Sequence, residues 1–121
     1  MNVRPKKTGI PRIIDAGRHS IDGLASTWRE EAAFRQECAL GLLFLAALPF
    51  LDRSGLENAV MVGSLVLVLM AELLNTGIEK AIDRVGYDDH PLSKFAKDAG
   101  SAGVFVALVN VPVTWALILL D

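Results

Sequence analysis

Three long apolar stretches dominate the pattern of hydrophobic and polar residues along the chain: residues 32–51, 58–82 and 98–120. A helix needs about 20 mainly apolar residues to cross the hydrocarbon layer of a membrane. The first stretch reaches this length only if its polar first turns lie at the interface, whereas the second is long enough for its last turns to emerge among the headgroups. The pattern therefore predicts an all-α membrane protein with three transmembrane helices.

The segment before the first span is amphipathic. In PRIIDAGRHSIDGLASTW, which begins at Pro11, apolar residues recur at helical spacing and most charged residues lie elsewhere around the helix. Pro11 suits the first turn of such a helix, and Trp28 stands close to the first span. A basic amphipathic helix in this position is expected to lie in the membrane surface. We therefore predict an interfacial helix over residues 11–30.

Composition agrees with a small membrane protein. The 121 residues are 52% hydrophobic and have a mean hydropathy of +0.40, beyond that of a small soluble domain. This length sets a limit of one domain, which we expect to cover residues 1–121. Cys38 is the one cysteine, so an internal disulfide and a cysteine-based metal cluster are both excluded.

The basic residues are distributed unevenly around the predicted spans. Arg53 alone lies in the first loop, whereas the others concentrate before the first span and around the second loop. Cytoplasmic segments carry an excess of Lys and Arg, so the N-terminus and the second loop are predicted to be cytoplasmic and Asp121 to lie outside. The concentrated residues are Arg4, Lys6, Lys7, Arg12, Arg18, Arg29 and Arg35, followed by Lys80, Arg84, Lys94 and Lys97.

A polar stripe, defined here as Glu72, Asn75, Glu79 and Asp83, follows the apolar part of the second span. The spacing i, i+3, i+7, i+11 places the four side chains on one helix face. Glu72 follows at least twelve residues without a charge, and a carboxylate deep in a membrane costs about 2.5 to 3.5 kcal/mol on insertion scales. We therefore expect Glu72 to have a function, whereas solvation alone is an equal alternative for Asp83.

Other charged residues are predicted to lie at the same membrane depth. They come from the start of the first span and from the start of the third. A group of carboxylates without His or Cys ligands suits a hard cation such as magnesium, and magnesium in turn suggests phosphates. These residues are Glu30, Glu31, Glu37, Lys97 and Asp98.

Small residues in the third span favour close helix packing. A ridge of such residues lets helices approach closely in lipid, and we expect this role for its glycines. Asn110 is expected to form an interhelical hydrogen bond and Pro112 a kink. Trp28 and Trp115 are predicted to anchor opposite interfaces. The ridge consists of Ala96, Gly100, Gly103 and Ala107.

Three segments, EEAAFRQE, AELLNTGIEKAIDRVG and AKDAGSA, together resemble the prokaryotic diacylglycerol kinase family over almost the whole chain. The middle segment matches the family motif, with Gly77 in place of the more usual Ala or Ser. The resemblance implies ATP-dependent phosphorylation of a membrane lipid by a homotrimer. It also implies sites between neighbouring subunits, with part of the nucleotide contacts coming from the neighbour.

The resemblance also implies roles for individual positions. Glu72 would be the catalytic base, and Glu31 and Glu79 would hold magnesium. His19 stands where a close relative would have a tyrosine near the nucleotide base, and the alternative is an ordinary surface histidine. The implied nucleotide-binding residues are Arg12, His19, Glu31, Glu79, Asp88, Asp89, His90, Lys97 and Asp98. The implied substrate-binding residues are Arg12, Glu72, Asn75, Ser101 and Trp115.

The motifs of soluble kinases are absent from the sequence, which has no Walker A loop and no H-R-D or D-F-G segment. The resemblance therefore predicts a diacylglycerol kinase of the bacterial inner membrane that uses ATP with magnesium and has no nucleic-acid partner. Two alternatives stay open. One is an undecaprenol kinase of the same family, and the other is a non-enzymatic three-span subunit whose polar stripe pairs with a larger protein.

Overall fold

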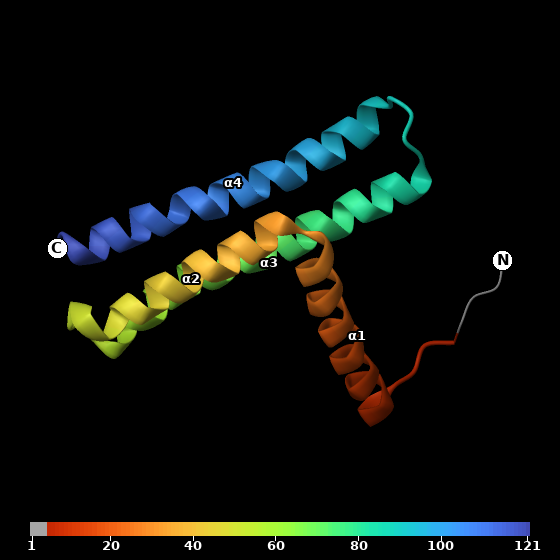
Figure 1. Cartoon of the computed structure of the whole chain (residues 1–121). Coiled ribbons are helices and arrows are strands. Elements are labelled where there is room, and N and C mark those ends of the chain that lie inside the picture. Colours follow the sequence, from red (N-terminus) through yellow and green to blue (C-terminus); the bar gives the residue numbers. More distant parts are fainter. Residues whose placement is uncertain (1–4) are drawn as a thin grey trace.

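The computed structural model describes residues 5–121, so Arg4 lies outside the described residues. The described chain is all-helical (Figure 1). Three of its helices are long and apolar enough to cross a membrane, with mean hydropathy of 1.4, 1.9 and 2.1 in chain order. The predicted all-α membrane fold is confirmed. The elements are α1 (Gly9–Glu30), α2 (Ala32–Leu51), α3 (Gly55–Val85) and α4 (Pro91–Leu119).

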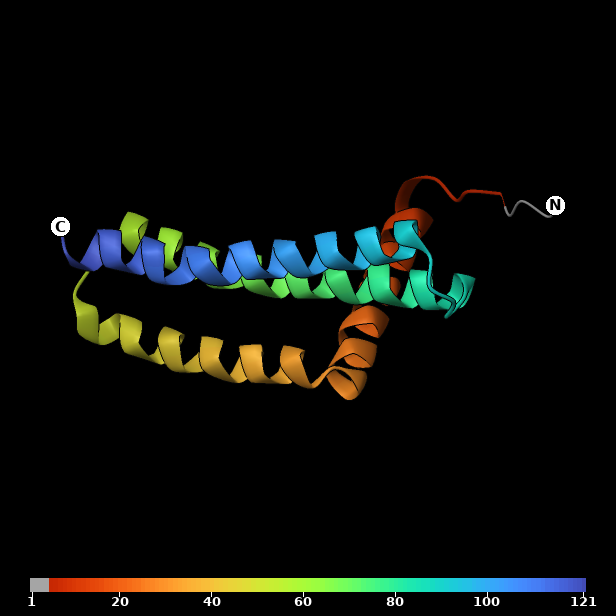
Figure 2. The ribbon, with the colours of Figure 1, turned by 90° about the horizontal axis from the view of Figure 1, so that it is seen from above.

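The three long helices form one antiparallel bundle. α3 and α4 pack together along most of their length, and α2 lies against α3 (Figures 1 and 2). α1 leaves the bundle at a steep angle and contacts both α2 and α3. Such an angle suits a helix that lies in the membrane surface while the others cross the membrane.

The helix boundaries differ from the predicted ranges by one to three residues at several ends, and most of all at the start of α4. α2 matches the predicted stretch 32–51, but α3 begins at Gly55, before residue 58, because Ser54 and Glu57 form a capping box. α4 begins at Pro91 instead of residue 98, because His90 caps its first turn and Pro suits that position. The loop between α3 and α4 is therefore short. Lys94 and Lys97, which were counted with this loop, lie on α4.

The prediction that Trp115 anchors a membrane interface is wrong. Trp115 lies buried in the bundle, with 7% of its surface exposed. Its indole Nε1 donates to the backbone oxygen of Met61 at 3.3 Å and to Ser64 Oγ at 3.0 Å. Phe44 on α2 packs edge-on against the same ring, with the ring centres 5.0 Å apart. A buried indole N–H needs such partners, so Trp115 joins all three long helices.

Two further expectations for α4 are corrected. Asn110 forms no interhelical bond in the described chain; its Oδ1 accepts from Thr114 Oγ1 of the same helix at 3.3 Å. The small-residue ridge is confirmed at Gly100, which lies against α3, and at Ala107, which is buried. A side chain at Gly103 would instead meet nothing within 4 Å, so this glycine faces away from α3.

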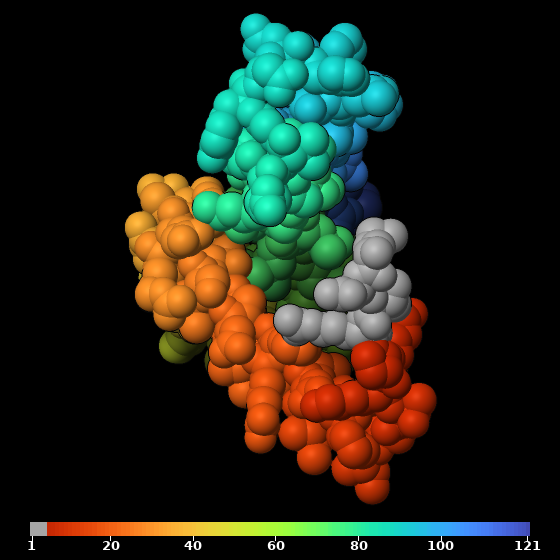
Figure 3. Space-filling view, turned by 90° about the vertical axis from the view of Figure 1, so that its right-hand side faces the viewer, coloured from red at the N-terminus to blue at the C-terminus, as the bar shows by residue number. Residues whose placement is uncertain are grey.

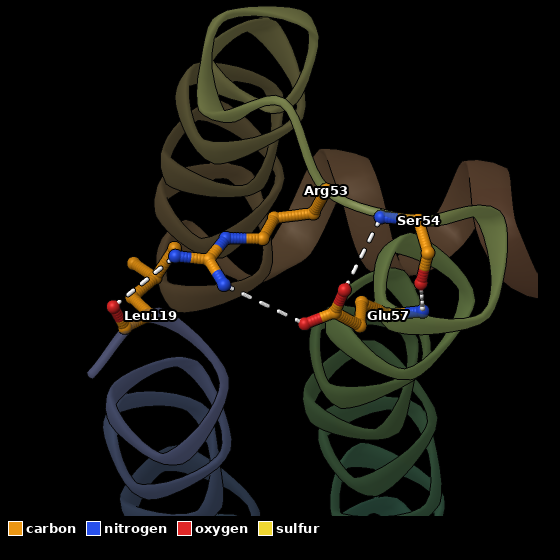
Figure 4. Close-up of polar contacts among 4 residues, drawn as sticks. All are labelled: Arg53, Ser54, Glu57 and Leu119. Atoms are coloured by element: carbon orange, nitrogen blue, oxygen red, sulfur yellow. Dashed lines mark hydrogen bonds and ion pairs between the residues drawn. The ribbon is translucent and has the colours of Figure 1, made fainter. Parts of the chain in front are cut away.

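Arg53 links the helices at the end of the bundle where α2 and α4 end and α3 begins (Figure 4). Its guanidinium donates to the backbone oxygen of Leu119 at 3.2 Å and lies 3.7 Å from the carboxylate of Glu57. A cation beside the last carbonyls of a helix is favoured by the helix dipole. Arg53 therefore ties the α2–α3 loop to the end of α4 and keeps the two long helices aligned, which in turn positions their other ends.

Candidate active site

The polar stripe forms one continuous face of α3, as its spacing predicted. Glu72 and Asn75 are buried, with 6% and 8% of their surface exposed, whereas Glu79 and Asp83 are half-buried. The rise between Glu72 and Glu79 is about 10 Å on an α-helix. The stripe therefore leads from the interior of the bundle towards the α3–α4 loop.

Glu37 on α2 lies opposite Glu72. The two carboxyl groups are close enough to interact directly. The Glu37 Oε2 atom is shielded from solvent and has no hydrogen-bond partner among the described residues. Two facing carboxyl groups leave an acceptor free for a donor such as an alcohol hydroxyl. The sequence placed Glu37 at this depth but assigned it no role, although a carboxylate in the second turn of an apolar helix was an available signal.

Asn75 fixes the carboxylate of Glu79. Its Nδ2 donates to Glu79 Oε1 at 3.2 Å, one turn along α3. Glu31 occupies the non-helical junction between α1 and α2, where its N–H donates to Thr27 O at 2.8 Å and its side chain caps neither helix. Glu31 and Glu79 both lie near enough to Glu72 for their charges to interact. The three predicted carboxylates thus lie in one region of the chain.

Asp83 at the end of the stripe is not merely solvated. Its Oδ1 accepts from Lys97 Nζ at 2.7 Å, which links α3 to α4. Lys94 pairs with Asp98 on α4 itself, at 2.5 Å. The Asp83–Lys97 pair therefore holds Lys97 against the end of α3, whereas the Lys94–Asp98 pair lies within α4.

A polar pocket of about 580 Å³ opens beside these ion pairs. His90 lies at its edge, where its Nδ1 accepts from the backbone N–H of Leu92 at 3.1 Å. This bond leaves Nε2 as the protonated nitrogen of a neutral ring, so the ring offers a donor. Five of the predicted nucleotide-binding residues line this pocket, namely Asp88, Asp89, His90, Lys97 and Asp98.

A second, apolar cavity of about 590 Å³ extends between α2, α3 and α4. Glu37 lies on its wall, and so do Phe44 and Trp115 further along the bundle. The remaining lining is almost entirely aliphatic. Its shape and chemistry suit a hydrocarbon chain whose polar end reaches Glu37 and Glu72.

Other predicted site residues lie apart in the single chain. Arg12 and His19 are exposed on α1, which extends from the side of the bundle opposite the α3–α4 loop (Figure 3). Ser101 is exposed on α4, whereas Trp115 is buried among the long helices. Within residues 5–121, no three His, Cys, Asp or Glu side chains form a group that could hold a metal ion. One chain therefore gathers only part of the predicted site.

The last turn of α1 is fixed to α3 by charge. Lys80 Nζ lies 3.0 Å from the carboxylate of Glu30. The hydrogen bond from Lys80 and the positive charge of its ammonium group hold the pKa of Glu30 below its usual value. This exposed pair links the end of α1, next to Glu31, to α3.

Comparison with known proteins decides the family. The family model described as prokaryotic diacylglycerol kinase matches residues 18–119. The chain belongs to this family. Curated proteins named diacylglycerol kinase are similar over most of their length. The protein from Pseudomonas aeruginosa is 47% identical over 114 residues, covering 94% of this chain and 93% of the relative.

Two further relatives extend the agreement. The diacylglycerol kinase of Haemophilus influenzae is 41% identical over 94% of this chain and 97% of its own length. The diacylglycerol kinase of Escherichia coli K12 is 41% identical over 93% of this chain and 92% of its own length. The match to the prokaryotic diacylglycerol kinase family covers all of α2, α3 and α4 and the part of α1 from residue 18 onwards, so it includes His19 but not Arg12.

Proposed function

We propose that this chain, as one domain over residues 1–121, transfers the γ-phosphoryl group of ATP to the hydroxyl of 1,2-diacylglycerol and produces phosphatidate. The observation that carries the proposal is the buried Glu72 carboxyl group together with Glu37, which lines the apolar cavity and has a shielded Oε2 atom without a hydrogen-bond partner among the described residues. A lipid in that cavity would present its hydroxyl to an unpartnered carboxylate oxygen. The names of the relatives support the same lipid and nucleotide.

Glu72 acts as the general base in the proposed reaction. The substrate hydroxyl attacks the γ-phosphorus, the bond to the β–γ bridging oxygen breaks, and ADP leaves with that oxygen. The hydroxyl proton passes to the Glu72 carboxylate. Burial beside apolar side chains excludes bulk water, which would otherwise compete as the acceptor. Glu37 accepts a hydrogen bond from the hydroxyl or from protonated Glu72.

ATP is expected to bind beside the other end of the stripe, with its γ-phosphate reaching along the stripe towards Glu72. Lys97 and Asp98 line the polar pocket, and Lys97 is held against α3 by Asp83. A lysine ammonium has three donors, so two remain for phosphate oxygens when Asp83 takes one. ATP would enter this pocket from the cytoplasm while the lipid stays at membrane depth. The excess of basic residues on this side supports a cytoplasmic N-terminus in the bacterial inner membrane.

Glu31 and Glu79 fit a magnesium ion that arrives with ATP. Both offer carboxylate oxygens, which hard cations prefer, and Asn75 already orients the Glu79 carboxylate. The ion would neutralise charge on the phosphate oxygens during transfer. Glu31 and Glu79 would each contribute a negative oxygen, and the Asn75 amide would keep Glu79 in place.

A homotrimer would complete this site. Large apolar side chains on α2 and α4 remain exposed in the single chain, including Leu43, Phe105 and Val106. Lipid covers such surfaces, but it cannot cover the charged end of α3 without a cost of several kcal/mol. A neighbouring copy would cover that end and bring its α1 residues, Arg12 and His19, to the polar pocket.

Removing one metal carboxylate should change the magnesium dependence of activity. Glu31→Gln and Glu79→Gln are each expected to raise the magnesium concentration for half-maximal activity by about ten-fold or more, with a smaller change in the KM for lipid. The reason is that each variant lacks one negative oxygen of a hard-cation site. Activity is measured against magnesium at fixed ATP. An unchanged magnesium curve in both variants would remove these carboxylates from the metal site.

The acceptor is tested with purified protein in mixed micelles, with γ-labelled ATP, magnesium and one lipid alcohol at a time. We expect labelled phosphatidate with 1,2-diacylglycerol and little label with undecaprenol. Labelled undecaprenyl phosphate as the main product would favour the other family activity. No labelled lipid from any acceptor, with correctly folded protein, would favour a non-enzymatic subunit.

A further inference from the structure

Gly100 on α4 lies directly against the carboxamide of Asn75. A Cβ atom at this glycine would overlap Asn75 Oδ1 and would lie 3.3 Å from Asn75 Cγ and 3.5 Å from Ile78 Cδ1. Real Cβ atoms essentially never show an overlap like the one with Oδ1, whereas the contact with Cγ would be tight and that with Ile78 Cδ1 ordinary. An alanine at position 100 would therefore have to displace the Asn75 side chain or separate α3 from α4.

Asn75 has little freedom to move without consequence. It is 8% exposed, and its Nδ2 donates to Glu79 Oε1 at 3.2 Å. Its Oδ1, the atom that faces Gly100, is buried and has no hydrogen-bond partner in the described chain. The carboxamide thus lies between the bare backbone of Gly100 and the carboxylate of Glu79, so a shift on one side is passed to the other.

We propose that Gly100 is a positioning residue that acts through Asn75 on Glu79. Its missing side chain leaves the space in which the Asn75 amide lies, and that amide fixes the direction of the Glu79 carboxylate. The inference rests on the proposed role of Glu79 towards magnesium. It also goes beyond close helix packing, the role expected from the small-residue ridge, because a packing role alone would not require Asn75.

The test compares Gly100→Ala with Gly77→Ala. Gly77 lies on α3 between Asn75 and Glu79, but a Cβ there would meet nothing within 4 Å. Binding of Mn²⁺ with a non-hydrolysable ATP analogue is measured by electron paramagnetic resonance, which does not depend on turnover. We expect about 10- to 100-fold weaker Mn²⁺ binding in Gly100→Ala and wild-type binding in Gly77→Ala. Circular dichroism and crosslinking check that both variants fold and assemble.

A double-variant cycle separates positioning from packing. Asn75→Ala removes the atoms that an alanine at position 100 would displace. Gly100→Ala should therefore weaken Mn²⁺ binding by less than about two-fold when Asn75 is already alanine, because the two changes act through one contact. An equal loss in both backgrounds would overturn the proposal, and so would wild-type binding in Gly100→Ala.

The same experiment distinguishes this inference from the proposed function. If the wild-type protein binds no Mn²⁺ with the analogue, the metal role of Glu79 fails and the positioning role fails with it. If the wild type binds Mn²⁺ and Gly100→Ala behaves like Gly77→Ala, the metal role stands and only the positioning role is overturned.

Discussion

Replacing Glu72 by Gln is expected to lower kcat for diacylglycerol phosphorylation by at least about 100-fold, the scale on which a general base contributes. The amide keeps the size of the carboxylate and some of its hydrogen bonds, but it cannot accept the hydroxyl proton. Because Glu72 is 6% exposed, water cannot readily take its place as the acceptor of that proton. Turnover is measured at saturating ATP and lipid, so that a change in binding does not contribute.

Glu57→Gln is the matched control for this variant. Glu57 lies at the other end of α3 and forms the capping box with Ser54, and Gln keeps that box. We expect near wild-type turnover from Glu57→Gln. Wild-type turnover in a correctly assembled Glu72→Gln protein would exclude Glu72 as the base and leave its burial without a function.

The second large effect is expected when two defective chains are mixed. Arg12→Ala should lower activity by about 10- to 100-fold if Arg12 contacts phosphate, since a charged hydrogen bond is lost. Arg12 is exposed in the first turn of α1 and does not line the polar pocket of its own chain. Mixed trimers of Arg12→Ala and Glu72→Gln chains would contain some sites with both residues intact. Activity should therefore rise well above that of either variant alone.

A second mixture serves as the control. Lys97 donates a hydrogen bond to Asp83 of its own α3, so Lys97 and Glu72 would belong to the same half of the proposed shared site. Mixing Glu72→Gln with Lys97→Met chains should therefore give no rescue. Rescue is measured in mixtures that crosslinking shows to contain both chains. Absence of rescue in the first mixture would mean that each subunit holds a complete site, and rescue in the second would contradict this division.

The span positions could be predicted because lipid requires long apolar helices, whereas the starts of α3 and α4 could not. α2 begins and ends where the hydropathy pattern placed it. α4 begins earlier, at Pro91, because His90 caps its first turn, so the helix includes a polar turn with Lys94 and Lys97 that hydropathy left out of the span. Hydropathy indicates which part of a helix lies in the hydrocarbon layer. The helix itself extends beyond that part, as far as its capping residue. The cap at His90 and the capping box at Ser54 set these two starts, and hydropathy alone does not reveal either.

The candidate site, too, could be predicted only in part from the sequence. The spacing of the polar stripe was sufficient to place Glu72, Asn75 and Glu79 on one face, because a helix repeats regularly. Contacts between helices depend on their relative rotation and shift along the axis, which no spacing within one helix determines. For this reason the Asp83–Lys97 pair and the approach of Gly100 to Asn75 became visible only in the structure. The burial of Trp115 followed from the same packing, against the usual preference of Trp for interfaces.

The most direct test of the account is the stoichiometry of transfer in the purified wild-type protein. Labelled phosphatidate and ADP are measured together, in micelles that contain 1,2-diacylglycerol, magnesium and γ-labelled ATP. The account predicts one phosphatidate for each ADP, and almost none of either product from Glu72→Gln. ADP without labelled phosphatidate, or equal production of phosphatidate by Glu72→Gln, would contradict it.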